Sequence, residues 1–504
     1  MAILNSVFSW LIKKRIHQIE LFKKYPKDVQ NEWFSKLILN ARDTEWGKKF
    51  AYADIKSYKD FRRNVPVSDY EDIYPYIERL RNGEQNLLWN SEIKWFAKSS
   101  GTTANKSKFI PVSYESLEEC HFKAGKDLIS IYYNNFPDAK LFEGMALAMG
   151  GTHTPRHINN QLYYDGDLSA ILIQNLPFWA EFRRTPQISI ALMDEWESKI
   201  EMMAHETSVE DVTNISGVPS WSLLLMKRIL EISNKKNMSE VWPNMEVFFH
   251  GGVNFEPYRA QFEALFPAGG VNFVDTYNAS EGFFGIQDIP TQSDMLLMLD
   301  YGIFYEFIPQ DKLLLGIRDA IPLEEVKMDI NYAMVISTNG GLWRYLIGDT
   351  VMFTSVCPFR IRITGRTRNF INAFGEELIV DNADKAFATA CERCDARINE
   401  YHGAPVYFSG NAKGAHEWMI EFEKAPSDLD LFTEIFDNAL KNLNSDYEAK
   451  RYHSMVLELP KILPLKAGTF YLWLKSRGKL GGQHKVPRLS NNREVIEEIY
   501  KIIQ

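Results

Sequence analysis

Strand-like apolar runs alternate with helical patterns through the first two thirds of this chain, and this alternation constrains its fold most. Short apolar runs at residues 141–149 and 245–249 predict strands, whereas residues 113–134, 196–205 and 221–232 show the periodicity of amphipathic helices. Strands that are followed in turn by helices form parallel sheets with helices packed on both faces. We therefore expect an α/β fold built on doubly wound sheets.

A smaller unit is expected beyond a break at residues 359–368. Its elements are a strand and three helices, at residues 417–423, 381–391, 428–442 and 492–503. This tail is long enough for a small α/β domain of about 140 residues. We therefore expect two domains, residues 1–364 and residues 365–504.

Composition and charge argue against nucleic acids and membranes as binding partners of this chain. With a formal net charge of −9 and a pI near 5.7, the chain is not predicted to bind nucleic acid or an anionic membrane. No apolar run is long enough for membrane insertion, and the apolar start of the chain has the spacing of an amphipathic helix. Four scattered cysteines, including the pair in CERC at 391–394, favour a reducing, cytoplasmic compartment. None of these features indicates an oligomeric state.

Residues 99–108 read SSGTTANKSK, and they follow a strand-like run at 93–98. Hydroxyl and amide dipoles with one or two lysine charges suit a polyphosphate, so this segment is a candidate phosphate-binding loop. Its spacing differs from that of the P-loop. An ordinary polar turn is the alternative for this segment alone.

Two later segments place an aromatic residue and an acid beside glycine, just after a probable strand. They read TYNASEG at 276–282, after the run 271–274, and GLWRYLIGDT at 341–350, after the run 333–337. Strand ends are where α/β proteins place ligand-binding groups. An aromatic ring can stack on a base, and a carboxylate can accept from ribose hydroxyls or hold a hard cation. A polar turn beside a buried aromatic residue is the alternative for each segment.

In this order the three segments resemble those of the acyl-adenylate-forming superfamily. The closer resemblance is to the Gretchen Hagen family of auxin-responsive acyl acid amido synthetases. The stretches that carry it also include VPVSDYEDIYPYIER at 65–79, SGVPSW at 216–221 and QHKVPR at 483–488. The resemblance spans nearly the whole chain. It implies a luciferase-like fold: a large N-terminal domain of doubly wound sheets with a β-barrel-like part, and a smaller, mobile C-terminal domain.

The resemblance also implies an activity. Such a ligase uses ATP and Mg²⁺ to convert a small carboxylic acid to an acyl-adenylate and pyrophosphate, and then transfers the acyl group to the amine of an amino acid. An acyl-CoA ligase stays open as an alternative, because its first half-reaction is the same. A non-catalytic acyl- or nucleotide-binding protein is the alternative from another class, and the combination of Glu281, Asp349 and Lys485 argues against it.

The family's motifs map onto specific positions of this sequence. The residues of the phosphate loop would be Ser99, Ser100, Gly101, Thr102, Thr103 and Lys108. The residues beside the adenine and the acyl carboxylate would be Gly251, Gly252 and Val253, where glycine permits a close backbone approach. The other nucleotide-binding residues would be Tyr277, Asn278, Ala279, Ser280, Asp349 and Arg366.

Individual roles follow from the same resemblance. Tyr277 would stack on adenine, and Ser280 would lie near the α-phosphate. Glu281 would be a catalytic residue that holds Mg²⁺. Asp349 would accept hydrogen bonds from the ribose hydroxyls, and Arg366 would approach the ribose.

Lys485 would be the second catalytic residue. It would bridge the substrate carboxylate and the α-phosphate after the C-terminal domain closes about a hinge at 365–368. Two positions depart from the family's pattern. Asn105 stands where the phosphate loop commonly has glycine, and asparagine tolerates left-handed backbone. Leu346 stands where plant relatives carry arginine, so the role of that arginine is lost or passes to Arg344.

The acyl pocket is expected among helices of the large domain. Trp221, Met226 and His153 are the candidates for binding the acyl group. For Met226 the alternative is an ordinary core position, because it belongs to an apolar stripe with helical spacing. For His153 the alternative is an ordinary loop histidine.

Overall fold

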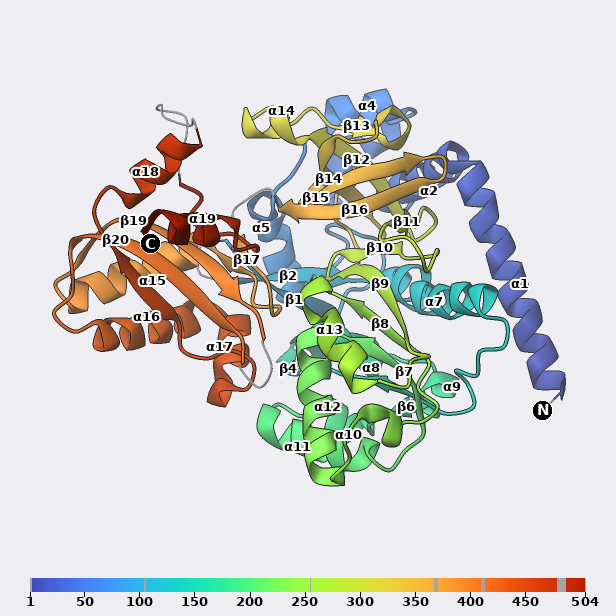
Figure 1. Cartoon of the computed structure of the whole chain (residues 1–504). Helices are drawn as coiled ribbons and strands as arrows, with labels where there is room; N and C mark the ends of the chain where they lie inside the picture. The colour runs from blue at the N-terminus through green and yellow to red at the C-terminus, as the bar shows by residue number, and fades with distance from the viewer. Residues whose placement is uncertain are drawn as a thin grey trace.

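The computed structural model describes residues 2–103, 106–253, 255–366, 370–408, 413–477 and 486–503. The chain folds into a large body and a smaller C-terminal part, which lie side by side (Figure 1). Helix α1 (Ala2–Lys24) runs along the side of the large body that is farthest from the small part. A helix is therefore present at the start of the chain, where the sequence predicts one.

One mixed sheet of 12 strands forms the centre of the large body. Its parallel half has the order β6 (Arg184–Thr185), β3 (Met145–Ala148), β7 (Val212–Gly217), β8 (Val247–Gly251) and β9 (Asn272–Ala279). On one face, Phe248 packs against Phe262 of helix α13 (Glu256–Leu265). On the other face, Val247 and Phe249 cluster with Tyr132 of helix α7 (Phe122–Asn135). The sheet is thus covered on both faces, as the sequence predicts.

The other half of the same sheet is antiparallel. It continues from β9 through β10 (Gly282–Ile286), β11 (Met295–Leu297), β16 (Phe359–Arg366), β15 (Tyr345–Val356), β14 (Asn331–Thr338), β12 (Ile303–Pro309) and β13 (Ile321–Pro322). The segment 65–79 is joined to this half. The Ser68 amide donates to the Arg344 carbonyl at 2.9 Å, and the Leu346 amide donates to the Ser68 carbonyl at 2.9 Å.

A second sheet of 4 strands contains the hydroxyl-rich segment. Its order is β2 (Lys106–Val112), β1 (Trp95–Thr103), β5 (Gln161–Gly166) and β4 (His153–Ile158). The strand expected at 93–98 extends to Thr103, so the segment forms a hairpin instead of an open loop. Ser99 is paired with Lys108, and Thr103 with Lys106. Asn105 at the tip lies outside the described residues.

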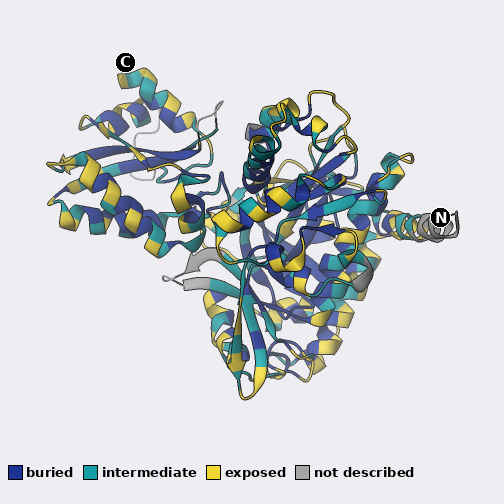
Figure 2. Cartoon of the chain, turned by 90° about the horizontal axis from the view of Figure 1, so that it is seen from below, coloured by how far each residue is buried: buried dark blue, intermediate teal, exposed yellow. Residues whose placement is uncertain are grey.

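The C-terminal part is built on a sheet of 3 strands, β19 (Arg397–Val406), β20 (Ala415–Lys424) and β21 (Lys461–Leu465). Helices α15 (Val380–Arg393) and α16 (Leu429–Leu443) cover one face, where Phe387 stacks on Phe436 above Trp418. Met419 on the opposite face clusters with side chains of α18 (Thr469–Ser476) and α19 (Glu494–Ile503). Figure 2 shows the buried residues concentrated along the sheets and the inner sides of the helices.

The remaining elements that border the site are helices and one short hairpin. They are α5 (Tyr70–Arg81), α8 (Leu168–Gln174), α11 (Trp196–Thr207), α12 (Pro219–Ser233), α17 (Ser445–Arg451), β17 (Phe370–Ile371) and β18 (Leu378–Ile379). Every helix in the described part of the chain is too short or too polar to cross a membrane.

Candidate active site

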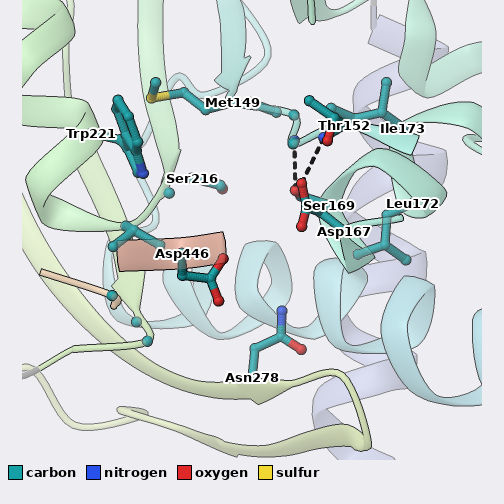
Figure 3. Close-up of a pocket in the computed structure, with 18 of the residues that line it drawn as sticks. Met149, Thr152, Asp167, Ser169, Leu172, Ile173, Ser216, Trp221, Asn278 and Asp446 are labelled. Atoms are coloured by element: carbon teal, nitrogen blue, oxygen red, sulfur yellow. Dashed lines mark hydrogen bonds between the residues drawn. The ribbon is translucent and has the colours of Figure 1, made fainter. Parts of the chain in front are cut away.

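A cavity of about 610 Å³ lies where the carboxyl ends of the parallel strands meet the C-terminal part. Four neighbouring parallel strands each contribute a lining residue: Ala148 of β3, Ser216 of β7, Gly251 of β8 and Thr276 of β9. Asp446 of α17 lines the cavity from the C-terminal part. Carboxyl ends of parallel strands meet at one edge of a sheet, which brings these groups together. Figure 3 shows Trp221 and Leu172 on opposite sides of the cavity, with Asp446 between them.

The cavity has apolar and polar walls. Its larger apolar and aromatic side chains are Leu128, Met149, Leu172, Ile173, Leu176, Trp196, Trp221, Phe249 and Phe283. Its charged side chains are Lys98, Asp167, Asp446 and Lys450. The Asp167 carboxylate is fixed because it accepts from the Thr152 amide at 2.7 Å (Figure 3). Such a cavity suits a substrate with an apolar body and a polar reacting end.

The two glycines at 251 and 252 are explained by different constraints. A Cβ on Gly251 would lie 2.5 Å from the Thr276 carbonyl oxygen, so only glycine lets β8 and β9 approach this closely. Gly252 has a φ of +82°, in the region that favours glycine. Both line the cavity, whereas Val253 is not among its lining residues.

The second and third sequence motifs meet through a hydrogen bond. The Tyr277 hydroxyl on β9 donates to an Asp349 carboxylate oxygen on β15 at 2.6 Å, and both side chains are buried. The Tyr277 ring packs edge-on against Phe284, with ring centroids 4.8 Å apart. Across the β15–β16 ladder Asp349 is paired with Arg366. The fold thus brings together three residues that the resemblance assigns to the nucleotide site.

Glu281 lies with Ser280 at the turn of the β9–β10 hairpin. Burial raises the pKa of the Glu281 carboxyl to about 7; the charge of Lys108 opposes this rise, and that of Asp349 adds to it. Lys108 and Asp349, from two other motifs, therefore lie within electrostatic reach of Glu281. No group of three potential metal ligands was found among the described residues. A single carboxylate still fits Mg²⁺, which usually takes one or two and completes its shell with waters and substrate phosphates.

Glu281→Gln should stabilise the ligand-free protein, and more so at pH 8 than at pH 5. An ordinary glutamate titrates near 4.5, so the unfolded chain loses this proton at a lower pH than the folded protein, which keeps it up to about 7. Between pH 4.5 and 7 the free energy of unfolding of the wild-type protein therefore falls as the pH rises. Above pH 7 the Glu281 carboxylate is charged in the folded protein as well, and the full cost of burying that charge is present. Thermal unfolding without Mg²⁺ measures the difference. An equal gain at both pH values would contradict the raised pKa.

Asn278 lines the cavity and is hydrogen-bonded to the side chain of His121. His121 ends the short helical segment η2 (Leu117–His121). Burial lowers the pKa of His121 to about 4, so its imidazole is neutral at pH 7. His121 therefore adds no positive charge beside Asn278.

Some of the expected site residues lie outside the described part of the structure. They are the side chains at 100–103 and at Arg366, and the segment 478–485, which includes Lys485. The chain is described again just after Lys485. There the Gly403 amide of β19 donates to the Arg488 carbonyl at 2.9 Å, which ties this segment to the small sheet.

Among the acyl-binding candidates, Trp221 lines the cavity and the other two do not. The Trp221 ring is stacked on Trp196, with ring centroids 4.2 Å apart. Met226 is 1% exposed and belongs to the hydrophobic core, which was its alternative interpretation. His153 begins β4, where its ring lies 5.7 Å from that of Tyr164.

Arg344 has a structural role. The residue is 3% exposed, and its guanidinium donates to both carboxylate oxygens of Glu306, at 2.7 and 2.9 Å. It also donates to the Val65 carbonyl at 2.7 Å. Because these contacts occupy the guanidinium, Arg344 is not available for the role that the resemblance assigns to an arginine at the position of Leu346.

The charged residues of the cavity are the ones that sequence reasoning missed. Lys98 directly precedes the hydroxyl-rich segment and is predicted only as part of a strand. Asp446 and Lys450 lie in α17, whose sequence SDYEAKR has the charge pattern of an ordinary exposed helix. No local signal distinguishes them, because only the packing of α17 near Trp221 turns this face inward.

Family models match three stretches of the chain. Those described as the GH3 family N-terminal domain, central domain and C-terminal domain match residues 15–271, 296–366 and 381–494. The chain belongs to the GH3 family. The division into residues 1–364 and 365–504 stays a prediction.

Relatives with curated names match this GH3 chain over nearly its whole length. The indole-3-acetic acid-amido synthetase GH3.3 of Arabidopsis thaliana is 22% identical, over 96% of this chain and 93% of the relative. The 4-substituted benzoates-glutamate ligase GH3.12 of the same plant is 24% identical, over 95% and 96%. The jasmonoyl–L-amino acid synthetase JAR6 of Nicotiana attenuata is 24% identical, over 95% and 94%.

Solved structures confirm the fold. The GH3.15 acyl acid amido synthetase has a TM-score of 0.61 at 18% identity, covering 97% of this chain and 95% of its own. A 2-hydroxyisobutyryl-CoA ligase in complex with its acyl-AMP and CoA has a TM-score of 0.58 at 13% identity, covering 95% and 92%. The large α/β body with a smaller C-terminal part is thus the fold of adenylate-forming enzymes.

Proposed function

We propose that this chain is an ATP-dependent acyl acid–amido synthetase. The observation that carries the proposal is that Lys108 of the β1–β2 hairpin and Asp349 both lie within electrostatic reach of Glu281, while Asn278, on the strand just before Glu281, lines the cavity. A phosphate-binding segment, a carboxylate for a hard cation and a carboxylate for ribose are the parts that ATP requires. The names of the relatives, which form amides from small acids, support the same activity.

The reaction has two steps. A carboxylate oxygen of the acid attacks the α-phosphorus of ATP, and pyrophosphate leaves with its bonding electrons. The resulting acyl-adenylate has AMP as a good leaving group, which a free carboxylate lacks. The amine of an amino acid then attacks the acyl carbon; the C–N bond forms, the bond to AMP breaks, and the amine releases a proton.

The chain's own groups divide the work of the first step. The hairpin at 99–108 would bind the phosphates through its hydroxyl and amide donors, with Lys108 as a point charge. Tyr277 and Asp349 would hold the nucleoside. Glu281 would hold Mg²⁺, which when bound neutralises phosphate charge during the attack. The small domain would then move to bring in Lys485 and later withdraw it.

The acid would occupy the apolar end of the cavity, among Leu128, Phe249 and Phe283. A small carboxylic acid with an apolar body fits these walls. CoA is not the favoured acceptor, because the relatives named above are amide-forming enzymes. We place the enzyme in the cytoplasm, which its free cysteines support.

With ATP, Mg²⁺ and a competent acid, the protein should exchange pyrophosphate into ATP and, with an amino acid, release AMP and an acyl amide. The acid panel includes indole-3-acetate, a 4-substituted benzoate and straight-chain fatty acids, and the amide is detected by mass. Release of ADP instead of AMP would eliminate adenylation. Thioester formation with CoA and no amide from any amino acid would favour the acyl-CoA ligase.

A further inference from the structure

We propose that Lys450 binds the α-carboxylate of the acceptor amino acid. The inference rests on the proposed function and assigns a part of the cavity that the first half-reaction does not use. Lys450 belongs to α17 of the C-terminal part and lines the cavity together with Asp446 of the same helix. Its ammonium is the group that would meet an incoming carboxylate.

Lys450 is a buried lysine whose donors are not used by the protein. The residue is 7% exposed, and within the described ranges its ammonium makes no hydrogen bond or ion pair. Its contact with the protein is a cation–π interaction, 4.4 Å from the centroid of the Trp221 ring. Such a contact orients an ammonium but leaves its N–H donors free.

A second buried lysine nearby, Lys199, has an ammonium group whose donors are all used by backbone carbonyls. Lys199 lies over Trp196, 4.6 Å from the ring centroid, and Trp196 is stacked on Trp221. Its ammonium donates to the carbonyls of Gly150, Gly151 and Met193 at 2.6, 3.1 and 3.2 Å. The two lysines flank one tryptophan pair, yet only Lys199 is satisfied by the protein. This difference points to a ligand for Lys450.

The position of Lys450 favours the acceptor over the acid. A Cβ on Gly375 would lie 3.5 Å from the Lys450 ammonium nitrogen and 3.9 Å from Val218, and a Cβ on Gly252 would lie 3.5 Å from Val218. Gly252, Val218 and Gly375 thus form a continuous wall from the expected acyl carboxylate to Lys450. The apolar walls at Leu128 and Phe249 come from other elements, α7 and β8. The acid can fill that end while the acceptor is held at the junction of the two parts.

The charges on α17 match a zwitterion. Asp446 precedes Lys450 by one helical turn, so both side chains lie on the same face of the helix. In Figure 3 the Asp446 carboxylate points into the cavity, where it can attract the acceptor's ammonium group. Burial lowers the pKa of Lys450, an electrostatic penalty that a bound carboxylate would offset.

The helix that carries Lys450 is firmly held. Arg451 pairs with Asp437 at 2.7 Å, and the Tyr447 hydroxyl donates to the same carboxylate at 2.7 Å. The side-chain amide nitrogen of Asn444 donates to the Glu376 backbone carbonyl at 2.9 Å. A rigid support of this kind is what a specific carboxylate site requires.

The test compares amino acids with their α-amides as acceptors. The probes are glycine, alanine, aspartate and glutamate, each with its α-carboxamide, assayed with an acid that supports pyrophosphate exchange. Wild-type protein should prefer the free acid, measured as kcat/KM for amide formation. Lys450→Met, which keeps the length of the side chain, should raise the KM for the amino acid about 10- to 100-fold and remove most of this preference, because a charge-assisted hydrogen bond is lost.

Pyrophosphate exchange is measured on the same samples. It should be unchanged in Lys450→Met, and Lys450→Arg should keep part of the preference. The matched control is Lys461→Met, at an exposed lysine of β21, which should change neither reaction. The amine of an α-carboxamide loses its proton more easily than the amine of the free amino acid. We therefore compare the ratio of kcat/KM for the free acid to kcat/KM for the α-carboxamide between the wild-type protein and each variant.

Three outcomes count against the proposal. An unchanged preference for the free α-carboxylate in Lys450→Met would show that another group binds it. An equal loss of pyrophosphate exchange would place Lys450 in the first half-reaction or in the fold. No amide from the wild-type protein with any acceptor would overturn the proposed function itself, and that result is separate from the first two.

Discussion

Glu281→Ala should slow adenylation by about a hundredfold or more, measured as acid-dependent pyrophosphate exchange. Glu281 lies within electrostatic reach of Lys108 in the β1–β2 hairpin and of Asp349. Removing a hard oxygen ligand of Mg²⁺ at the moment when phosphate charge is rearranged costs several kcal/mol, and each 1.4 kcal/mol is a factor of about ten in rate.

The matched control is Glu434→Ala, at an exposed position of α16, which should leave the rate unchanged. Raising the Mg²⁺ concentration should recover part of the activity of Glu281→Ala if the carboxylate acts through the metal. Normal exchange in a folded Glu281→Ala protein would show that Glu281 is structural and that the metal is held elsewhere.

Lys485→Ala should lower the rate of adenylation about as strongly as Glu281→Ala does, while the affinity for ATP stays nearly unchanged. The role comes from the family resemblance, and the segment 478–485 lies outside the described residues. Its attachment is described: the buried His402 ring of β19 contacts the Pro487 carbonyl at 2.6 Å, and Gly403 and Arg488 are hydrogen-bonded. The segment that follows Lys485 is therefore attached to the small sheet, whereas most of the residues that the resemblance assigns to the nucleotide belong to the large body.

Pyrophosphate exchange and ATP binding are measured on one preparation of Lys485→Ala. A large loss of exchange with a dissociation constant for ATP that changes by less than about threefold would support a role in the reacting state. If exchange and ATP affinity fall together, Lys485 is a binding or stability residue and the assigned role is wrong.

Most of the secondary structure is predictable from the sequence because it follows local periodicity. The helix expected at 196–205 is α11 (Trp196–Thr207), and the one at 428–442 is α16 (Leu429–Leu443). The strand expected at 417–423 is β20 (Ala415–Lys424). Each buries one face or stripe of apolar side chains, and that pattern can be read without knowing the partner.

The conformation of the hydroxyl-rich segment at 99–108 could not be predicted from the local sequence. Its composition predicts a polar loop, and the structure continues both flanking strands through it as a hairpin. Serine, threonine and lysine do not exclude a strand; the ladder between β1 and β2 decides the conformation, and a ladder depends on two segments at once.

The sequence alone determined the alternation of strands and helices, the division into a large and a small α/β unit, and the motifs at strand ends. It did so because these features are periodic or contiguous along the chain. Only the tertiary structure decided that the Tyr277 hydroxyl would donate to Asp349, 72 positions away in the sequence. It also decided that Arg344 would donate to the buried Glu306 carboxylate and that Lys450 would line the cavity. Each of these depends on which surfaces pack together, and a residue in an ordinary charged helix carries no local mark of the face that packing will bury.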